Sequence, residues 1–264
     1  MGKKWFSRLL LLVTAVCILL PAALLLVWSV TGRWPWPRLT PETYTLRTLR
    51  ELLFGSTSLL RLLGSSVALA GTTAVLSTAV AGPTARATQL YPFSRREVAR
   101  FCGLLPLLIP GTVFAIGVHL VFLRLGLADT VAGVLLVHLV TALPYAIAIL
   151  TDVTAAVGAN LEEQAAVLGA GPLAAFRWAT LPRLVPGILS SLSMAFTLSY
   201  SQYFSTLIVG GGRVRTLAMV LVPYIQSGDR PLASAYAAVF TGSALLVFAL
   251  FEWAIHRLER RGEL

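Results

Sequence analysis

The long apolar segments of this sequence hold three ionisable residues, His119, His138 and Glu252, which are the first candidates for chemistry. A histidine in such a segment could relay protons, whereas a lone histidine there is more often packed and hydrogen-bonded, so both roles stay open. No cluster of His, Cys, Asp and Glu has metal-ligand spacing, and no Ser, His and Asp can be placed on one face. We therefore expect no metal and no catalytic residue in this chain.

A nucleotide site is the second kind of chemistry to consider, and the sequence excludes its common form. A phosphate-binding loop consists of Gly, four residues and then Gly-Lys-Ser/Thr, but the only lysines are Lys3 and Lys4. The run Gly210-Gly211-Gly212 lacks this lysine, so we interpret it as a flexible loop. Any energy from ATP must then enter through another chain.

A row of polar residues follows one face of an apolar segment. Ser193, Thr197, Tyr200 and Ser201, with Ser190 before them, recur at steps of three and four residues, which is the spacing of one helix face. Two functions fit this polar stripe. Its hydroxyl groups could bond one helix to another, or they could line a path for a transported solute at the interface with a second subunit.

These residues must be positioned by membrane helices. Hydrophobic residues make up 57% of the 264 residues and charged residues 12%, which predicts an all-α integral membrane protein. The net charge of +10 sits mainly on arginines at the ends of apolar runs, so it fits lipid headgroups and not nucleic acid. Pro106 and Pro110 should kink the third span. The six expected spans are Leu9 to Val30, Leu62 to Gly82, Phe101 to Leu123, Thr130 to Leu150, Ile188 to Val209 and Ser234 to Ile255.

The basic residues predict the orientation of these spans. Lys3 and Lys4 precede the first span, and the stretch from Thr84 to Arg100 carries four arginines, so both should lie in the cytoplasm. Six spans then place both termini in the cytoplasm. The stretch from Gly210 to Leu232 becomes a glycine-containing loop on the outer side.

A polar island from Asn160 to Gly187 separates the fourth and fifth spans. Asn160 followed by Glu163 predicts a capped helix that starts at Leu161. Gly169 should end that helix, and Pro172, after a glycine, should start a second one. Further breaks are expected at Leu181-Pro182 and Pro186-Gly187.

The island resembles the EAA loop in the permease subunits of bacterial ABC importers. The pattern of that family is Glu-Ala-Ala, three residues, Gly, nine residues, Ile, one residue and Leu-Pro. This sequence keeps the spacing, with Gln164 in place of Ala and Ala179 in place of Ile, in the series Glu163-Gln164-Ala165, Gly169, Ala179 and Leu181-Pro182. The alternative is a loop that merely caps itself.

The resemblance implies that Glu163, Ala165 and Gly169 lie on a coupling helix that docks in a groove of a cytoplasmic ATPase. Leu181-Pro182 would turn the chain back towards the fifth span. Residues 1–264 would form a single transmembrane domain, with its core at about 60–255 and the coupling loop at about 151–187.

The resemblance further implies that this chain lies in a bacterial inner membrane and has three protein partners. These are the ATPase, which would bind the ATP, a second permease subunit, homologous or identical, and an extracytoplasmic solute-binding protein. The subgroup most similar to this chain imports polyamines, thiamine or iron. The alternatives from other classes are an ion-driven secondary transporter and a membrane scaffold that transports nothing.

Overall fold

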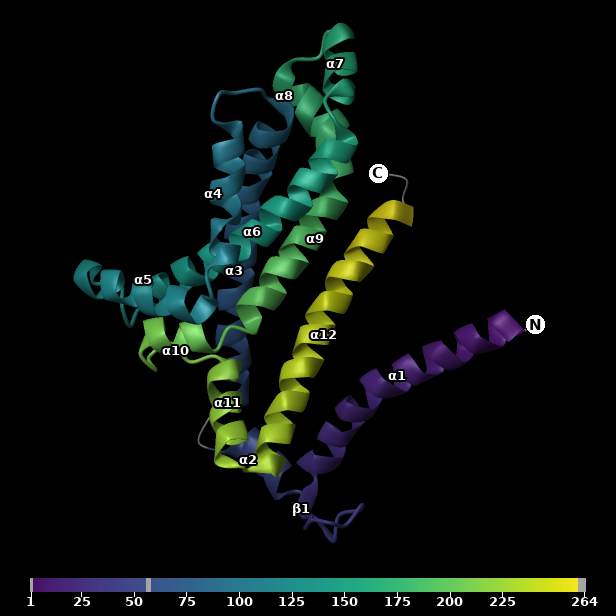
Figure 1. Ribbon diagram of the computed structural model, residues 1–264, viewed down its shortest axis with the longest axis vertical. Coiled ribbons are helices and arrows are strands. Elements are labelled where there is room, and N and C mark those ends of the chain that lie inside the picture. The colour runs from purple at the N-terminus through teal and green to yellow at the C-terminus, as the bar shows by residue number, and fades with distance from the viewer. Residues whose placement is uncertain (1, 56–57, 261–264) are drawn as a thin grey trace. The chain divides into compact units, whose positions relative to one another are not determined.

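The computed structural model describes residues 2–55 and 58–260, most of which are helical. Contacts divide the chain into two compact units, Met1–Leu63 with Thr216–Ser243, and Gly64–Arg215 with Ala244–Leu264. Figure 1 shows the helices in chain order. The all-α class expected from the composition is confirmed, since the two strands in the described ranges form only a short hairpin. That residues 1–264 act as a single transmembrane domain stays a prediction.

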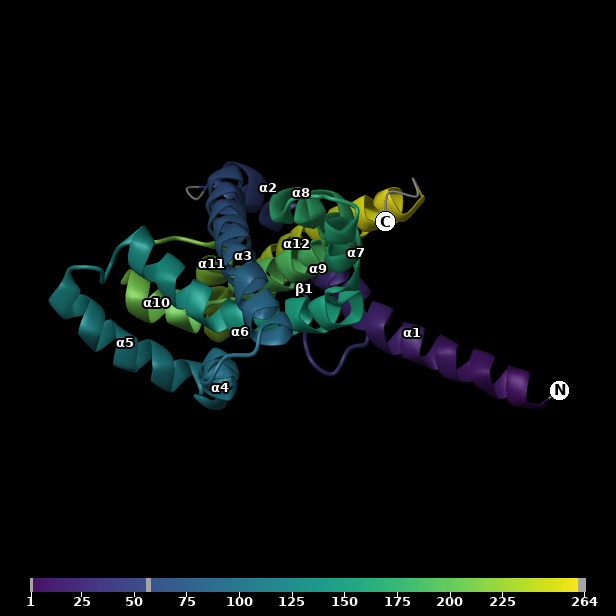
Figure 2. The ribbon, with the colours of Figure 1, turned by 90° about the horizontal axis from the view of Figure 1, so that it is seen from above.

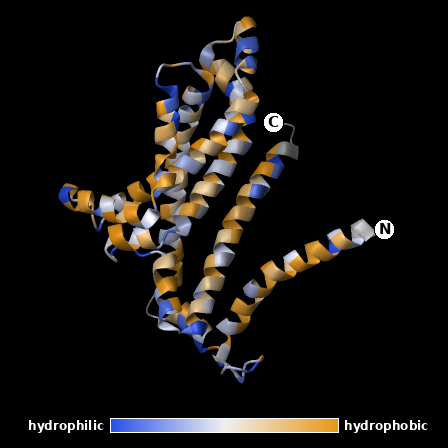
Figure 3. Ribbon diagram, in the orientation of Figure 1, coloured by the Kyte–Doolittle hydropathy of each residue, from blue (hydrophilic) through white to orange (hydrophobic). Residues whose placement is uncertain are grey.

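The first unit begins with a long apolar helix, α1, which Figure 3 shows in hydrophobic colour along most of its length. At its C-terminal end the ring of Trp28 stacks on that of Trp34, with centroids 4.5 Å apart, next to an antiparallel hairpin. The elements of this unit are α1 (Gly2–Ser29), β1 (Thr31–Arg33), β2 (Thr43–Tyr44), α2 (Arg47–Phe54), α11 (Leu217–Ser227), and the first parts of α3 (Leu59–Leu90) and α12 (Arg230–Arg260).

The second unit is built around α6 and α9, which lie side by side (Figure 1). The shorter α10 packs against α5 and α6, as the view in Figure 2 also shows. This unit contains the remaining parts of α3 and α12. Its other elements are α4 (Arg96–Leu108), α5 (Gly111–Leu125), α6 (Val131–Val157), α7 (Asn160–Val167), α8 (Pro172–Ala175), the π-helix η1 (Phe176–Thr180), α9 (Leu181–Tyr200) and α10 (Phe204–Gly210).

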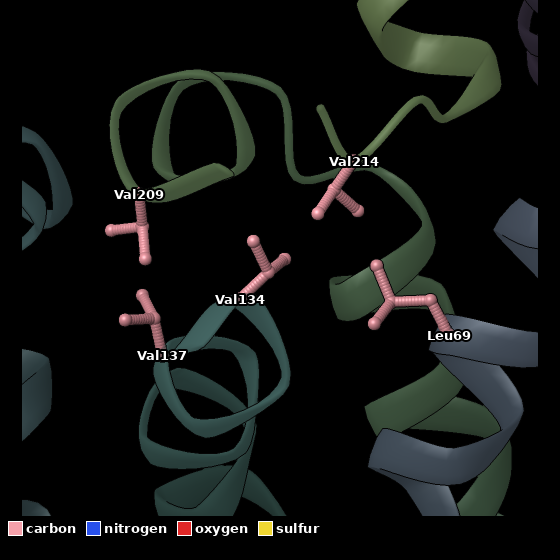
Figure 4. Packing of buried hydrophobic residues seen from close by; sticks show 5 residues of the cluster. All are labelled: Leu69, Val134, Val137, Val209 and Val214. Atoms are coloured by element: carbon pink, nitrogen blue, oxygen red, sulfur yellow. The ribbon is translucent and has the colours of Figure 1, made fainter. Parts of the chain in front are cut away.

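Two apolar clusters form the core of the second unit. Figure 4 shows the first, in which valines of α6 and α10 face each other and Leu69 of α3 closes one side. The second joins α3 to α6 through alanines, whose small side chains let two membrane helices approach closely. The buried members are Leu69, Val134, Val137, Val209 and Val214 in the first cluster, and Ala81, Ala85, Ala146 and Leu150 in the second.

Five helices in the described part of the chain are long and apolar enough to cross a membrane, and the number reaches six if α4 and α5 count as one bent span. The five are Trp5–Ser29, Leu59–Leu90, Val131–Val157, Pro172–Tyr200 and Arg230–Leu258. They correspond to the first, second, fourth, fifth and sixth expected spans. A multi-pass membrane protein is therefore confirmed.

The third expected span is not one kinked helix. It is divided between α4 and α5, whose axes differ by 102°. The break lies at Ile109, which is extended (φ −99°, ψ 125°), because the following proline disfavours a helical conformation at this residue. Pro110 then caps α5. Pro106, in contrast, stays inside α4.

The fifth expected span and the loop after it also differ from the prediction. Helix α9 starts at Leu181 and ends at Tyr200, so the chain breaks before α10 and does not run on as a single span to Val209. The expected loop from Gly210 to Leu232 contains α11, an apolar helix that ends where Gly228 adopts a left-handed conformation (φ 78°). A short apolar run such as this one can form a helix or remain in a loop, and periodicity alone does not separate the two.

Candidate functional site

The polar island forms a folded loop between α6 and α9, and its glycines set the turns. Gly158 (φ 66°) ends α6, and Gly169 (φ 87°) follows the end of α7. The N–H of Ala170 donates to the carbonyl of Ala165 over 2.9 Å, which closes that turn. Pro172 opens α8 at a position where its missing N–H is not needed. The predictions for Gly169 and Pro172 are confirmed at the level of backbone structure.

The predicted capping box is wrong. Ala159 occupies the N-cap position of α7 without a side-chain hydrogen bond, so Asn160 is already the first helical residue. The N–H groups of Glu162 and Glu163 both donate to the carbonyl of Ala159. The helix therefore begins one residue sooner than predicted, directly after the turn at Gly158, and the Asn160 side chain lies past the cap.

The residues assigned to coupling fall on both ends of this loop. Glu163 and Gly169 are exposed, and Ala165 is half-buried on α7. Leu181 and Pro182 are half-buried at the start of α9. The loop therefore presents Glu163 and Gly169 outward.

The breaks predicted at Leu181-Pro182 and Pro186-Gly187 are wrong, because the chain is helical without interruption from Pro172 to Tyr200. The π-helix precedes α9, and the N–H of Leu181 donates to the carbonyl of Phe176. Proline is tolerated in the first turn of a helix, where its N–H is not needed, so Pro182 fits after the change from π to α hydrogen bonding. At Gly187 a Cβ would lie 2.7 Å from Val153 Cγ2, so glycine is what lets α6 approach α9.

An ion pair that the sequence did not reveal holds the loop to α3. Nη2 of Arg86 lies 2.9 Å and 3.0 Å from the two carboxylate oxygens of Glu162. The guanidinium group also stacks over the ring of Phe176, 4.7 Å from its centroid. Arg86 was expected in a basic loop from Thr84 to Arg100, but α3 continues to Leu90 and α4 begins at Arg96. A neighbouring carboxylate, Glu162 rather than Glu163, thus makes the contact within this chain.

A cavity of about 400 Å³ lies beside this ion pair. Side chains of α3, α6 and α9 line it, among them Arg86, Leu150 and Leu184, and Phe176 of the loop also contributes. The lining is mostly apolar. This apolar hollow lies at the base of the loop, next to α3, α6 and α9.

The tip of the loop exposes apolar side chains. Val167 and Leu168 are 87% and 89% exposed, and Leu173 at the start of α8 is 78% exposed. Figure 3 shows hydrophobic colour at this tip next to hydrophilic residues of α7. Since Val167 and Leu168 lie outside the candidate membrane spans, an apolar surface there is typical of a protein contact.

The polar stripe on α9 is divided by burial. Ser190, Thr197 and Ser201 are exposed, whereas Ser193 and Tyr200 are buried. The hydroxyl groups of Thr197 and Ser201 bond to carbonyls of α9 itself. Only the exposed edge of the stripe could face a solute or a second subunit.

The bonds between helices come from a different face of α9. Ser191 Oγ lies 3.0 Å from Thr78 Oγ1, and Ser199 Oγ donates to Thr73 Oγ1 over 3.2 Å, so α9 is joined to α3 at two buried points. The sequence alone does not single out Ser191 and Ser199, because serine recurs on several faces of the helix.

His138 is fully buried, with both ring nitrogens in hydrogen bonds. Nδ1 lies 2.8 Å from Ser199 Oγ, and Nε2 lies 2.9 Å from Thr206 Oγ1. The Ser199 hydroxyl gives its single proton to Thr73, so its oxygen accepts from Nδ1–H of the ring. These contacts favour the packed role over the relay for His138. Among the described residues no group of three or more His, Cys, Asp and Glu could hold a metal ion.

Comparison with known proteins connects this architecture to transport. The model of a family described as "Binding-protein-dependent transport system inner membrane component" matches residues 80–263. The chain is 31% identical over 215 residues to ORF1 of Streptomyces antibioticus, which carries the name of an ABC transporter permease protein; 80% of this chain and 93% of that protein are covered. It is 25% identical over 200 residues to the spermidine/putrescine transport system permease protein PotC of Haemophilus influenzae, covering 76% and 78%. It is 34% identical over 146 residues to the molybdenum transport system permease protein ModB of Mycobacterium tuberculosis, covering 50% and 54%.

Proposed function

Because the chain belongs to the family of binding-protein-dependent transport system inner membrane components, we propose that it is the permease subunit of an ATP-driven importer in a bacterial inner membrane. The helices of this chain and of a second permease subunit, homologous or identical, form the passage. The chain catalyses no reaction, and ATP binds to a separate ATPase.

The observation that supports coupling to an ATPase is the loop between α6 and α9. It carries the EAA spacing, it exposes Leu168 at its tip, and Arg86 and Glu162 join it to α3. A surface contact with the ATPase can therefore displace a loop that is fixed to a membrane helix. Glu163, Ala165 and Gly169 belong to this docking surface, and Leu181 and Pro182 connect it to α9.

The orientation follows from the docking partner. The loop faces the cytoplasm, where the ATPase is, and both termini lie on the same side. The opposite side receives an extracytoplasmic solute-binding protein. The exposed edge of the polar stripe, Ser190, Thr197 and Ser201, lines the passage.

The solute is small and reaches the passage from the binding protein. The relatives described above are named for different solutes, spermidine or putrescine in one case and molybdenum in another. The polyamine relative covers more of this chain, so a polyamine is the first solute to test. The exposed stripe residues are uncharged, so the binding protein sets most of the specificity.

Uptake into membrane vesicles that contain the complete transporter tests this proposal. Vanadate should abolish uptake of radiolabelled polyamine, an uncoupler with ATP maintained should leave it unchanged, and an ATPase should copurify with the tagged chain. An uncoupler that stops uptake while ATP is maintained would indicate an ion-driven transporter instead. If no ATPase copurifies with the chain and no uptake is measured, the chain is a scaffold.

A further inference from the structure

The ion pair of Arg86 and Glu162 joins two segments that are 76 residues apart in the chain. Both side chains are largely buried, with 16% of Arg86 and 23% of Glu162 exposed. An ion pair in such a position resists separation, because two separated groups would each be a buried charge without a partner. The other ion pair that involves the basic segment, Arg100 with Glu97, has its carboxylate 81% exposed and lies within α4.

The geometry of this pair allows a shift without breakage. One nitrogen of Arg86, Nη2, contacts both oxygens of Glu162, while Nη1 is buried and has no hydrogen-bond partner. A fork in which two nitrogens meet two oxygens is the stronger arrangement for Arg and a carboxylate. A small displacement of α7 can therefore exchange the one-nitrogen contact for a fork, and the pair holds throughout.

Helix α3 carries this contact into the membrane. Arg86 lies 8 and 13 residues after Thr78 and Thr73, which is roughly 12 Å and 20 Å along a helix at 1.5 Å per residue. At these two positions α3 bonds to Ser191 and Ser199 of α9, the helix with the polar stripe. The loop is thus connected through one continuous helix to buried polar contacts with α9.

We propose that Arg86 and Glu162 form a positioning pair through which displacement of the loop moves α3 and, with it, its contacts to α9. This inference rests on the proposed function, because an ATPase must displace the loop. The pair touches neither solute nor ATP. It sets how much of each loop movement reaches the passage, so it determines the solute transported per ATP hydrolysed.

The test measures uptake and ATP hydrolysis together in vesicles with the complete transporter. Glu162→Gln keeps the size of the side chain and removes its charge, so we expect solute transported per ATP to fall about tenfold, within the usual range of coupling between sites. The exchange Arg86→Glu with Glu162→Arg restores the opposite charges and should recover most of the coupling. The matched control is Glu97→Gln, which removes the same charge from the exposed pair and should change nothing.

The amount of ATPase that copurifies with each variant separates the outcomes. Retained ATPase with a lower coupling ratio supports the positioning pair. An unchanged ratio in Glu162→Gln overturns it, as does failure of the charge exchange to recover coupling when the exchanged protein is stable and holds its ATPase. If Glu162→Gln does not accumulate in the membrane, Arg86→Lys replaces it with the same expectations, because lysine keeps the charge but cannot form the fork. Absence of vanadate-sensitive uptake in the unmodified transporter would instead refute the proposed function itself.

Discussion

Nδ1 of His138 lies 2.8 Å from Oγ of Ser199, so α6 and α9, which lie side by side in the second unit, share a buried polar contact. In a bilayer, apolar surface gives helices little reason to associate, and such contacts help to choose the partner helix and its register. The same ring reaches α10 through its other nitrogen. His138 therefore joins three helices.

Replacing His138 with alanine should lower the free energy of unfolding by about 1–3 kcal/mol, because two buried hydroxyl groups lose a partner. Unfolding by denaturant in mixed micelles measures this change. The matched control is Thr72→Ala, since Thr72 is exposed and bonds only to a carbonyl of its own helix. Its effect should stay within about 0.5 kcal/mol. Equal losses for both variants would show that the buried contacts do not stabilise the helices.

The sequence could predict features that depend on local chemistry. Gly169 ends a helix because a left-handed residue favours glycine, and Pro172 starts one because a first-turn proline loses no hydrogen bond. The membrane spans could also be predicted from local sequence, because the hydropathy and length of an apolar run are properties of that one segment.

Features that depend on packing between distant segments could not be predicted in this way. Glu162 and Glu163 are adjacent, and only the arrangement of α3 against α7 decides which of them meets Arg86. Helical periodicity shows which residues share a face but does not show what that face contacts.

The exposed tip of the loop predicts a docking contact that one charge can disrupt. Leu168→Glu should weaken copurification of the ATPase at least tenfold, since a central apolar contact at an interface contributes about 1.4 kcal/mol or more. The quantity to measure is the ATPase retained by the tagged chain during washing. Leu39→Glu is the matched control, because Leu39 is 92% exposed against 89% for Leu168 and lies in the hairpin segment. If both variants retain the ATPase equally, the tip is not the docking surface.

The backbone at Gly169 should matter more than the space around it. No atom lies within 4 Å of a Cβ built there, but the φ of 87° strains any residue with a side chain, at a cost of roughly 1–2 kcal/mol. Gly169→Asp should therefore uncouple transport and leave membrane insertion intact, as measured by uptake and by the amount of chain in the membrane. Gly171→Ala is a control for the substitution alone, since Gly171 has an ordinary φ of −69° and equal space. Normal uptake by Gly169→Asp would argue strongly against the docking role.

Burial divides the polar stripe, so the two kinds of position should differ in their access to water. In a background with Cys17 and Cys102 replaced by alanine, because both are exposed, a cysteine at Thr197 should react with a water-soluble thiol reagent. Its rate should change between the ATP-bound and ATP-free transporter, because alternating access opens and closes the passage.

A cysteine at the buried Ser193 should react at least tenfold more slowly, since a reagent must wait for local opening before it reaches a buried thiol. The rates come from quenched labelling followed by gel shift. If the cysteine at Thr197 stays unreactive in every state, the exposed edge of the stripe faces lipid or protein, and the passage lies along another face of the helices.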